Sequence, residues 1–166
     1  MKQIFKYSMM LVVMMMAVFG FTACSSSDDE DLPGGYVKTT EGVHRVEVSF
    51  DGNTAGWNGD LTFIAVYGDG THGKVKLYEN GSQISDSGAF SSEELRNYDI
   101  QTDAVCDQMA LTIIMSHSAG KTVEPVTVTL KSYINGVQKK VKTATFNANE
   151  VYKTIVFDSE LEADIL

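Results

Sequence analysis

Basic residues are scarce in this sequence, and so is cysteine. Lysine and arginine number 13 among 166 residues, against 22 aspartates and glutamates, which gives a formal net charge of −9. Such a negative field repels nucleic acid and anionic lipid headgroups, so proteins that bind either by charge are excluded. Only two cysteines occur, Cys24 and Cys106. No framework of disulfides staples the fold, and its stability must come from a buried core.

A long apolar run is also missing. The apolar stretch over residues 9–21 is shorter than the roughly 20 residues that a transmembrane helix needs. It follows Lys2 and Lys6 and ends at small residues, a layout that predicts a cleaved signal peptide over residues 1–23. Cleavage removes two lysines and no acid, so the remaining 143 residues carry a net charge of −11. Their number fits one domain of ordinary size.

The residues around the predicted cleavage point resemble a bacterial lipobox. Phe21, Thr22, Ala23 and Cys24 follow its pattern of small residues before a lipidated Cys, with Phe21 where Leu is usual. The resemblance implies that the lipoprotein signal peptidase cuts before Cys24 and that the thiol carries diacylglycerol. At about 0.8 kcal/mol per buried methylene, two or three acyl chains make a stable anchor in a membrane. Cys106 then has no disulfide partner.

The segment after Cys24 is similar to the Ser- and acid-rich tract of surface lipoproteins from the Bacteroidota. Residues 25–31 read Ser-Ser-Ser-Asp-Asp-Glu-Asp. The resemblance implies an outer-membrane location, lipid-anchored and facing the cell exterior. A solvated linker also fits, because a run of like charges without apolar residues does not order itself. We expect the lipidated Cys and an acidic linker over residues 24–35, and one folded domain over residues 36–166.

From residue 43 onward, apolar and polar residues alternate with a period of two. This period predicts strands, since alternate side chains of a strand point to opposite faces. Strands are expected over residues 43–50, 61–67, 74–79, 82–85, 109–116, 126–134, 137–146 and 151–157. Asn80-Gly81 and Asn135-Gly136 predict tight hairpin turns with positive φ. Lys139, Lys140 and Lys142 are typical of a protected edge strand.

Short strands at regular spacing predict the fold class. We expect an all-β chain folded as an antiparallel β-sandwich of about seven or eight strands, immunoglobulin-like or jelly-roll. One short helix is expected over residues 91–97, because Ser91 and Glu94 have the spacing of a capping box.

The only tryptophan, Trp57, suggests a ligand site. It lies among glycines and asparagines in residues 51–60, and an aromatic ring in a polar loop is a stacking platform for a sugar. The candidate ligand-binding residues are Trp57, Asn53, Asn58, Asp60, Tyr67 and His72. The alternative is that Trp57 folds back and closes the open end of the sandwich.

The sequence contains three motifs that can indicate catalysis, but the residues around each of them do not support a catalytic role. The Gly-x-Gly-x-x-Gly string over residues 68–73 is followed by a strand pattern, whereas a dinucleotide site needs a helix there. Asp103 and Asp107 flank Cys106 and would raise the pKa of its thiol, which favours a buried structural residue. Ser116 and His117 are neighbours on a strand and point to opposite faces. We expect no enzyme.

The sequence gives little indication of a metal site. Asp51-Gly52-Asn53 begins like a calcium loop, but Ala55 replaces the third ligand and no Glu follows in register, which excludes an EF-hand. A looser calcium site using Asp51, Asn53, Asp60 or Asp69 stays open. The three histidines, His44, His72 and His117, lack the spacing of zinc ligands. No metal and no cofactor is assigned.

Two functions remain after these exclusions. The first is a non-catalytic surface module that binds an extracellular glycan or protein. The second is a structural or interaction subunit, for example of a fimbria or an envelope complex, whose strand edges make the contacts.

Overall fold

The computed structural model describes residues 40–66 and 75–160. The chain divides into two units, Met1–Gly34 and Gly35–Leu166, and all described residues belong to the second. That unit is all-β, as the sequence predicts. Within the described ranges there is no helix of the length and apolarity needed to cross a bilayer.

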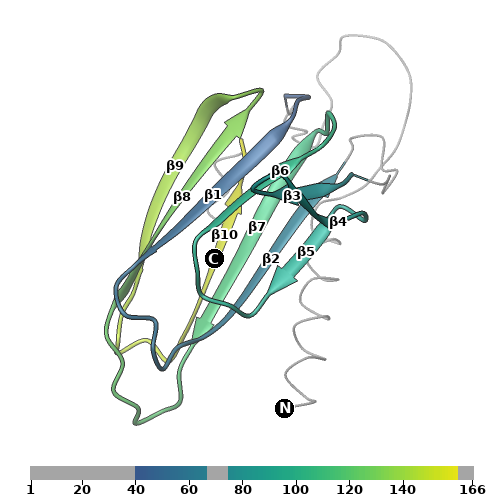
Figure 1. Cartoon of the computed structure of the whole chain (residues 1–166). Helices are drawn as coiled ribbons and strands as arrows, with labels where there is room; N and C mark the ends of the chain where they lie inside the picture. Colours follow the sequence, from purple (N-terminus) through teal and green to yellow (C-terminus); the bar gives the residue numbers. More distant parts are fainter. Residues whose placement is uncertain (1–39, 67–74, 161–166) are drawn as a thin grey trace, which may run out of the picture. The chain divides into compact units, whose positions relative to one another are not determined.

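The described residues of this unit form ten strands, more than the seven or eight expected. They are β1 (His44–Asp51), β2 (Asn58–Val66), β3 (Leu77–Glu79), β4 (Ser82–Ser85), β5 (Ala89–Ser92), β6 (Tyr98–Thr102), β7 (Gln108–Ser116), β8 (Val126–Ile134), β9 (Val137–Phe146) and β10 (Tyr152–Asp158). A six-stranded sheet has the order β4-β3-β6-β1-β8-β9, and a four-stranded sheet has the order β10-β7-β2-β5 (Figure 1). Every pairing is antiparallel. The predicted β-sandwich is confirmed.

The core lies between the two sheets because the strands alternate in burial. Along β8, every second side chain from Val126 to Ile134 is buried, and β7 repeats the pattern with Met109 to Met115. The largest apolar residues that face inward without exposure include Phe63, Phe146 and Phe157. Outward positions on β1, β6 and β8 of the six-stranded sheet are polar, so this part of its outer face presents hydrogen-bonding groups to solvent.

Both predicted Asn-Gly turns form. The φ angles are +49° at Asn80 and +80° at Gly81, and +51° at Asn135 and +77° at Gly136. These left-handed conformations match the right-handed twist of the flanking strands. The second turn joins β8 to β9, which ends the six-stranded sheet as the lysines predict. Lys139 is exposed and is the third residue of that strand.

The helix expected over residues 91–97 is wrong. Ser91 and Ser92 belong instead to β5 and pair with Thr62 and Leu61 of β2. The Ser92 hydroxyl accepts the Glu94 N–H at 3.2 Å, which makes a local turn in place of a capping box. Leu95 lies against Gly59 of β2. Pairing with a distant strand therefore overrides the local signal.

Candidate functional site

Trp57 does not offer a surface for ligand. Its side chain is 7% exposed and belongs to the core. The indole Nε1–H donates to the carbonyl of Glu124 at 2.9 Å, and the ring meets His117 edge-on with centroids 4.9 Å apart. The ring thus closes the space between the sheets, which is the second of the two interpretations of Trp57. A sugar has no open ring face to stack on here.

The other candidate residues of that site are separated from Trp57. Asn58 and Asp60 sit on β2, on the side of the strand opposite to the inward-facing Leu61, and neighbours along a strand point to opposite faces. The Asn53 side-chain oxygen accepts the Ala55 N–H at 3.0 Å and so shapes its own loop. Tyr67, His72 and the glycine-rich string over residues 68–73 lie outside the described residues, as does Cys24.

A metal site is not assembled in the part of the chain that the structure describes. No three His, Cys, Asp or Glu side chains in residues 40–66 and 75–160 converge in the manner of metal ligands. Of the residues considered for a loose calcium site, Asp51, Asn53 and Asp60 are described, and Asp69 is not.

Cys106 is a buried thiol. It is 1% exposed, and burial raises the pKa of its thiol to about 11, with a smaller contribution from the charge of Asp107. A thiol with so high a pKa is a poor nucleophile at neutral pH. From the sequence we expect the flanking carboxylates to raise the pKa of this thiol. In the structure, the larger cause is the burial of the thiol away from water.

Buried polar groups join the end of β10 to the other sheet. His44 Nδ1 lies 2.8 Å from the Ser159 hydroxyl, and the Ser132 hydroxyl donates to the carbonyl of Ser159 at 2.6 Å. His44, Ser132 and Ser159 have no measurable exposure. Burial also lowers the pKa of the His44 imidazole. These groups are out of reach of a ligand, so their role is to hold β10 in place.

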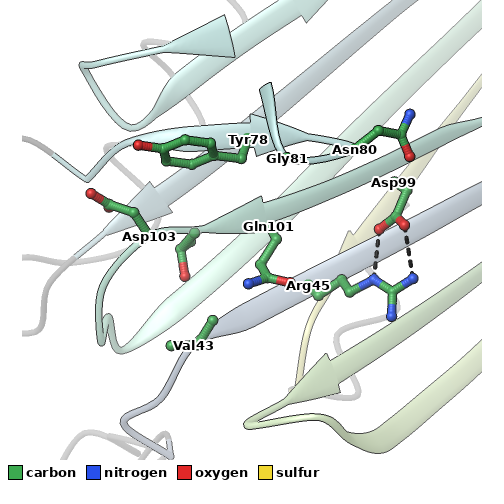
Figure 2. Close-up of a pocket in the computed structure, with 9 residues that line it drawn as sticks. Val43, Arg45, Tyr78, Asn80, Gly81, Asp99, Gln101 and Asp103 are labelled. Atoms are coloured by element: carbon green, nitrogen blue, oxygen red, sulfur yellow. Dashed lines mark hydrogen bonds and ion pairs between the residues drawn. The ribbon is translucent and has the colours of Figure 1, made fainter. Parts of the chain in front are cut away.

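An open pocket of about 410 Å³ lies on the outer face of the six-stranded sheet. Figure 2 shows the residues that surround it, from β1, β3 and β6, the positions next to β1 and β6, and the β3–β4 turn. It is lined by Val43, Arg45, Tyr78, Asn80, Gly81, Asp99, Gln101, Thr102 and Asp103. Strand pairing builds it, because Tyr78 lies opposite Gln101 and Gln101 lies opposite Arg45.

The Arg45 guanidinium in this pocket is already paired with carboxylates. Arg45 donates from Nε and Nη2 to the two carboxylate oxygens of Asp99 at 2.6 and 2.8 Å, as the dashed lines in Figure 2 mark. Arg45 also contacts Glu47 at 2.6 Å. The hydrogen bonds to Asp99 are the main reason that the pKa of the guanidinium is raised. Asp103 accepts the Lys76 N–H at 2.8 Å.

Three polar side chains in the pocket are left for a ligand. The Tyr78 hydroxyl and the side-chain amides of Asn80 and Gln101 make no hydrogen bond to any other described residue. Asn80 and Gln101 are exposed, and Tyr78 is half-buried. An aromatic ring with two planar amides is a combination suited to hydroxyl-rich ligands. Sequence reasoning missed all three: it gave Tyr78 and Asn80 only a strand and a turn, and Gln101 lies on the unpredicted β6.

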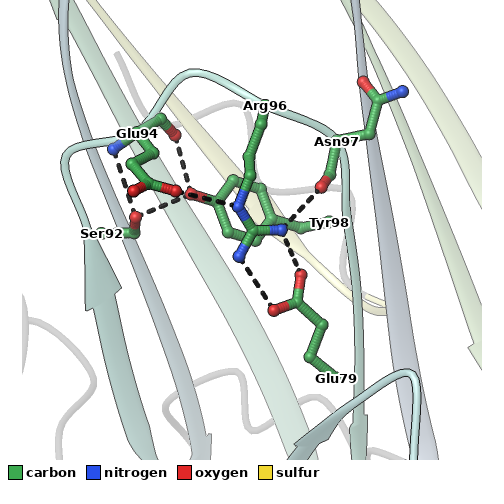
Figure 3. Close-up of polar contacts among 6 residues, drawn as sticks. All are labelled: Glu79, Ser92, Glu94, Arg96, Asn97 and Tyr98. Carbon is green, nitrogen blue, oxygen red and sulfur yellow. Dashed lines mark hydrogen bonds and ion pairs between the residues drawn. The ribbon is translucent and has the colours of Figure 1, made fainter.

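The hairpin that carries Asn80 is held from its other side. Arg96 donates from Nη1 and Nη2 to the Glu79 carboxylate at 2.5 and 2.9 Å. Its guanidinium also lies over the Tyr98 ring, 4.1 Å from the centroid. Figure 3 shows this cluster with Ser92 and Glu94 around the Tyr98 hydroxyl. Because Glu79 precedes Asn80, the cluster fixes one wall of the pocket.

Solved structures share this fold, whereas comparisons of sequence found no match. No protein-family model matches the chain, and no curated protein matches its sequence. A DUF4425 family protein from Bacteroides ovatus is 18% identical, with a TM-score of 0.61 over 72% of this chain and 97% of that one. A DUF4425 domain of unknown function from Bacteroides vulgatus is 16% identical, with a TM-score of 0.60 over 73% and 97%.

A third structure is similar at the same level. It is an NMR structure of the calcium-bound form of a protein from Parabacteroides distasonis, 17% identical, with a TM-score of 0.56 over 78% of this chain and 99% of that one. At such low identity these likenesses establish the fold alone. All three come from Bacteroides or Parabacteroides.

Proposed function

We propose that this chain is a lipid-anchored, non-catalytic binding module whose pocket on the six-stranded sheet takes a neutral, hydroxyl-rich ligand, that is, a glycan. The proposal rests on one observation above the others. Tyr78, Asn80 and Gln101 line one pocket with polar groups that no other described residue engages. Polar groups in this position make no hydrogen bond within the described protein, so they are available to bond a ligand.

The charge of the pocket favours a neutral ligand. The Arg45 guanidinium is already neutralised by Asp99 and Glu47, so an anion would have to compete with two carboxylates. Asp103 adds a further negative charge to the rim. Sugar hydroxyls need no such charge, because they exchange hydrogen bonds with amides and carboxylates and place their C–H faces on aromatic rings.

Binding is favoured over catalysis by how the carboxylates are engaged. Glycoside hydrolysis needs one carboxyl group that donates a proton and a second that acts on the sugar. Both oxygens of Asp99 accept from Arg45, and Asp103 accepts from a backbone N–H. Groups held in this way serve to position a ligand.

The anchor belongs to the same proposal. A Cys24 with acyl chains would hold the sandwich on the outer face of the outer membrane, through an acidic linker over residues 24–35. Support comes from the lipobox-like residues at 21–24 and the acidic tract that follows. The fold of proteins from Bacteroides and Parabacteroides is in keeping with it. A module tethered there meets glycans before any cytoplasmic ligand.

A structural or interaction subunit is the second candidate. β9 is a ten-residue strand with a free edge, and Val137 and Val141 on it are 61% and 51% exposed. An incoming strand could pair with such an edge. Lys139, Lys140 and Lys142 lie along this strand and act against pairing, so we place this function second.

The experiment is a glycan array probed with the mature chain carrying Cys24→Ser, so that no lipid is attached. We expect binding that Tyr78→Ala and Gln101→Ala each weaken by about tenfold, roughly 1.4 kcal/mol. Thr143→Ala is the matched control, because Thr143 is exposed on the same sheet face at β9, away from the pocket. Binding that survives both pocket variants, or no binding at all, contradicts the proposal.

A further inference from the structure

The register of the six-stranded sheet extends the pocket into a row. Tyr78 of β3 lies opposite Gln101 of β6, Gln101 opposite Arg45 of β1, and Arg45 opposite Tyr133 of β8. Beyond Tyr133, Gln138 of β9 completes the row. All five residues are half-buried or exposed. Because directly opposed residues of an antiparallel pair point to the same face, the row lies on the outer surface of the sheet.

The row is long enough for several sugars. Neighbouring strands are about 4.8 Å apart, so the three steps from β3 to β8 place Tyr78 and Tyr133 about 14 Å from each other. One pyranose repeat of an extended chain is close to one strand spacing. The distance between the two tyrosines therefore corresponds to about three sugar units.

Tyr133 is held in a fixed position. Its hydroxyl donates to Glu47 at 3.1 Å, and the Arg45 guanidinium lies 5.1 Å from the centroid of its ring. An aromatic side chain that is already ordered loses little conformational entropy when a ligand arrives. Tyr133 is thus a rigid second aromatic at the far end of the row.

The next row on the same face has a different character. There Asp99 lies opposite Glu47, and Glu47 lies opposite Lys131. These three residues are charged, and Asp99 and Glu47 are both engaged by Arg45. A row of three charged residues holds water more strongly than a row in which Arg45 is the one charged residue among two tyrosines and two glutamines. The uncharged ends of the first row therefore mark the path with the lower desolvation cost.

We infer that the ligand is a linear glycan of at least three units that crosses the strands from Tyr78 to Tyr133, with the pocket at one end of its path. The inference rests on the proposed function and specifies its ligand class: a chain in place of a single sugar. Arg45 lies in the middle of the path, where its partners Asp99 and Glu47 cancel its charge. Gln138 at β9 would meet a longer chain.

The test is an NMR titration of the ¹⁵N-labelled mature chain carrying Cys24→Ser. The probes are glucose, mannose, galactose and xylose, each with its linear oligomers up to the pentasaccharide. We expect monosaccharides to shift only the amide signals of residues 78–81 and 101, and trisaccharides or longer chains of one series to shift Tyr133 and Gln138 as well. Affinity should rise about tenfold from the monosaccharide to the trisaccharide, which corresponds to about 1.4 kcal/mol.

Variants separate the row from the pocket. Tyr133→Ala should remove the gain with chain length and leave monosaccharide affinity unchanged, whereas Tyr133→Phe keeps the ring and should retain the gain. Lys131→Ala, on the neighbouring row, is the control. Shifts confined to the pocket at every chain length overturn the row and leave the proposed function standing. The absence of any shift with all four series overturns both, and shifts at Tyr133 without the pocket overturn the path.

Discussion

Single residues at the core of this sandwich have roles that their neighbours in sequence do not disclose. Trp57 follows a glycine and precedes an asparagine, yet it is 7% exposed and bonded to the backbone of Glu124. His44 is fully buried and still keeps both ring nitrogens within reach of oxygen atoms, from Ser159 and Thr40. At this scale, stability depends on whether a polar atom on a large side chain finds its partner.

Trp57→Ala should destabilise the fold strongly. Removing a buried aromatic side chain costs about 3–5 kcal/mol, because a cavity remains and contacts are lost. Urea unfolding followed by circular dichroism measures the change; fluorescence is unsuitable because Trp57 is the only tryptophan. Trp57→Phe is the control and should cost less, since most of the volume remains while the hydrogen bond to Glu124 is lost. A change below about 1 kcal/mol for Trp57→Ala would contradict the buried position.

His44 should make the fold sensitive to mild acid. Burial lowers the pKa of its imidazole in the folded state, whereas the unfolded chain has a pKa of about 6.5. The unfolded state therefore binds more protons between these two pKa values, and the free energy of unfolding falls as the pH drops below about 6.5. Above that pH the stability is fully present.

Chemical unfolding at a series of pH values between 7.5 and 5 checks this dependence. His44→Gln, which cannot take up a proton, should have lower stability at pH 7.5 and a flatter dependence on pH. The carboxylates of Glu150 and Glu160, whose pKa values hydrogen bonds lower, add their own loss only in more acidic solution, below a pH of about 4.5. Equal slopes for both proteins between pH 6.5 and 5 would show that His44 does not titrate in this way.

At the scale of elements, hairpin turns and a cluster of ion pairs position the strands relative to one another. The hairpins at Asn80-Gly81 and Asn135-Gly136 both use positive φ at two residues. The Arg96 cluster then ties the segment after β5 to β3, through Glu79. These features fix the geometry of the pocket wall and contribute only Asn80 and Gly81 to its lining.

Gly136→Ala should cost about 1–2 kcal/mol. A Cβ at Gly136 would meet no atom within 4 Å, so the cost arises from the backbone alone, where φ is +77°. Thermal unfolding monitors the loss. Asn135→Gly serves as a control, because glycine adopts positive φ without strain. Unchanged stability in Gly136→Ala would mean that the turn relaxes to another type.

Arg96→Ala should loosen the β3–β4 hairpin. Arg96 is 44% exposed at the side chain and Glu79 is 13% exposed, so solvent screens part of the interaction and we expect a loss of about 1 kcal/mol. Amide hydrogen exchange should become faster over residues 77–85. Arg96→Lys keeps the charge and loses the planar fork, so its effect should be intermediate. If amide hydrogen exchange becomes faster to the same extent throughout the sandwich, Arg96 does not stabilise this hairpin locally.

At the scale of the whole molecule, the observed sandwich and the proposed anchor have separate origins. The sandwich is common to proteins from Bacteroides and Parabacteroides with 16–18% identity, which shows how little specific sequence it requires. The proposed anchor depends on the few residues at positions 21–24 of the sequence.

Cys24→Ala should abolish membrane attachment. We expect the natural protein to begin at Cys24 with acyl chains and to partition into detergent, since two or three chains make dissociation negligible. Intact mass and labelling with an alkyne fatty acid measure this directly. Cys106→Ala is the matched control and should retain the label. A mass that begins at Met1, or one without fatty acids, contradicts the anchor.

Local signals in the sequence were sufficient for the all-β class, the strand ranges over residues 126–134 and 137–146, and both Asn-Gly turns. The reason is that period-two alternation and the φ requirement of a tight turn are properties of a few consecutive residues. Tertiary structure alone decided that β5 replaces the expected helix, because Leu61 and Thr62 offer hydrogen bonds to Ser92 and Ser91 from 29 residues or more away.

The same division holds for the candidate site. Trp57 was conspicuous in the sequence, but its direction depends on a carbonyl 67 residues away. Tyr78, Gln101 and Arg45 became neighbours only through the pairing of β3 with β6 and of β6 with β1. Strand order is set by which inward faces pack together across the whole chain, and no single segment contains that information.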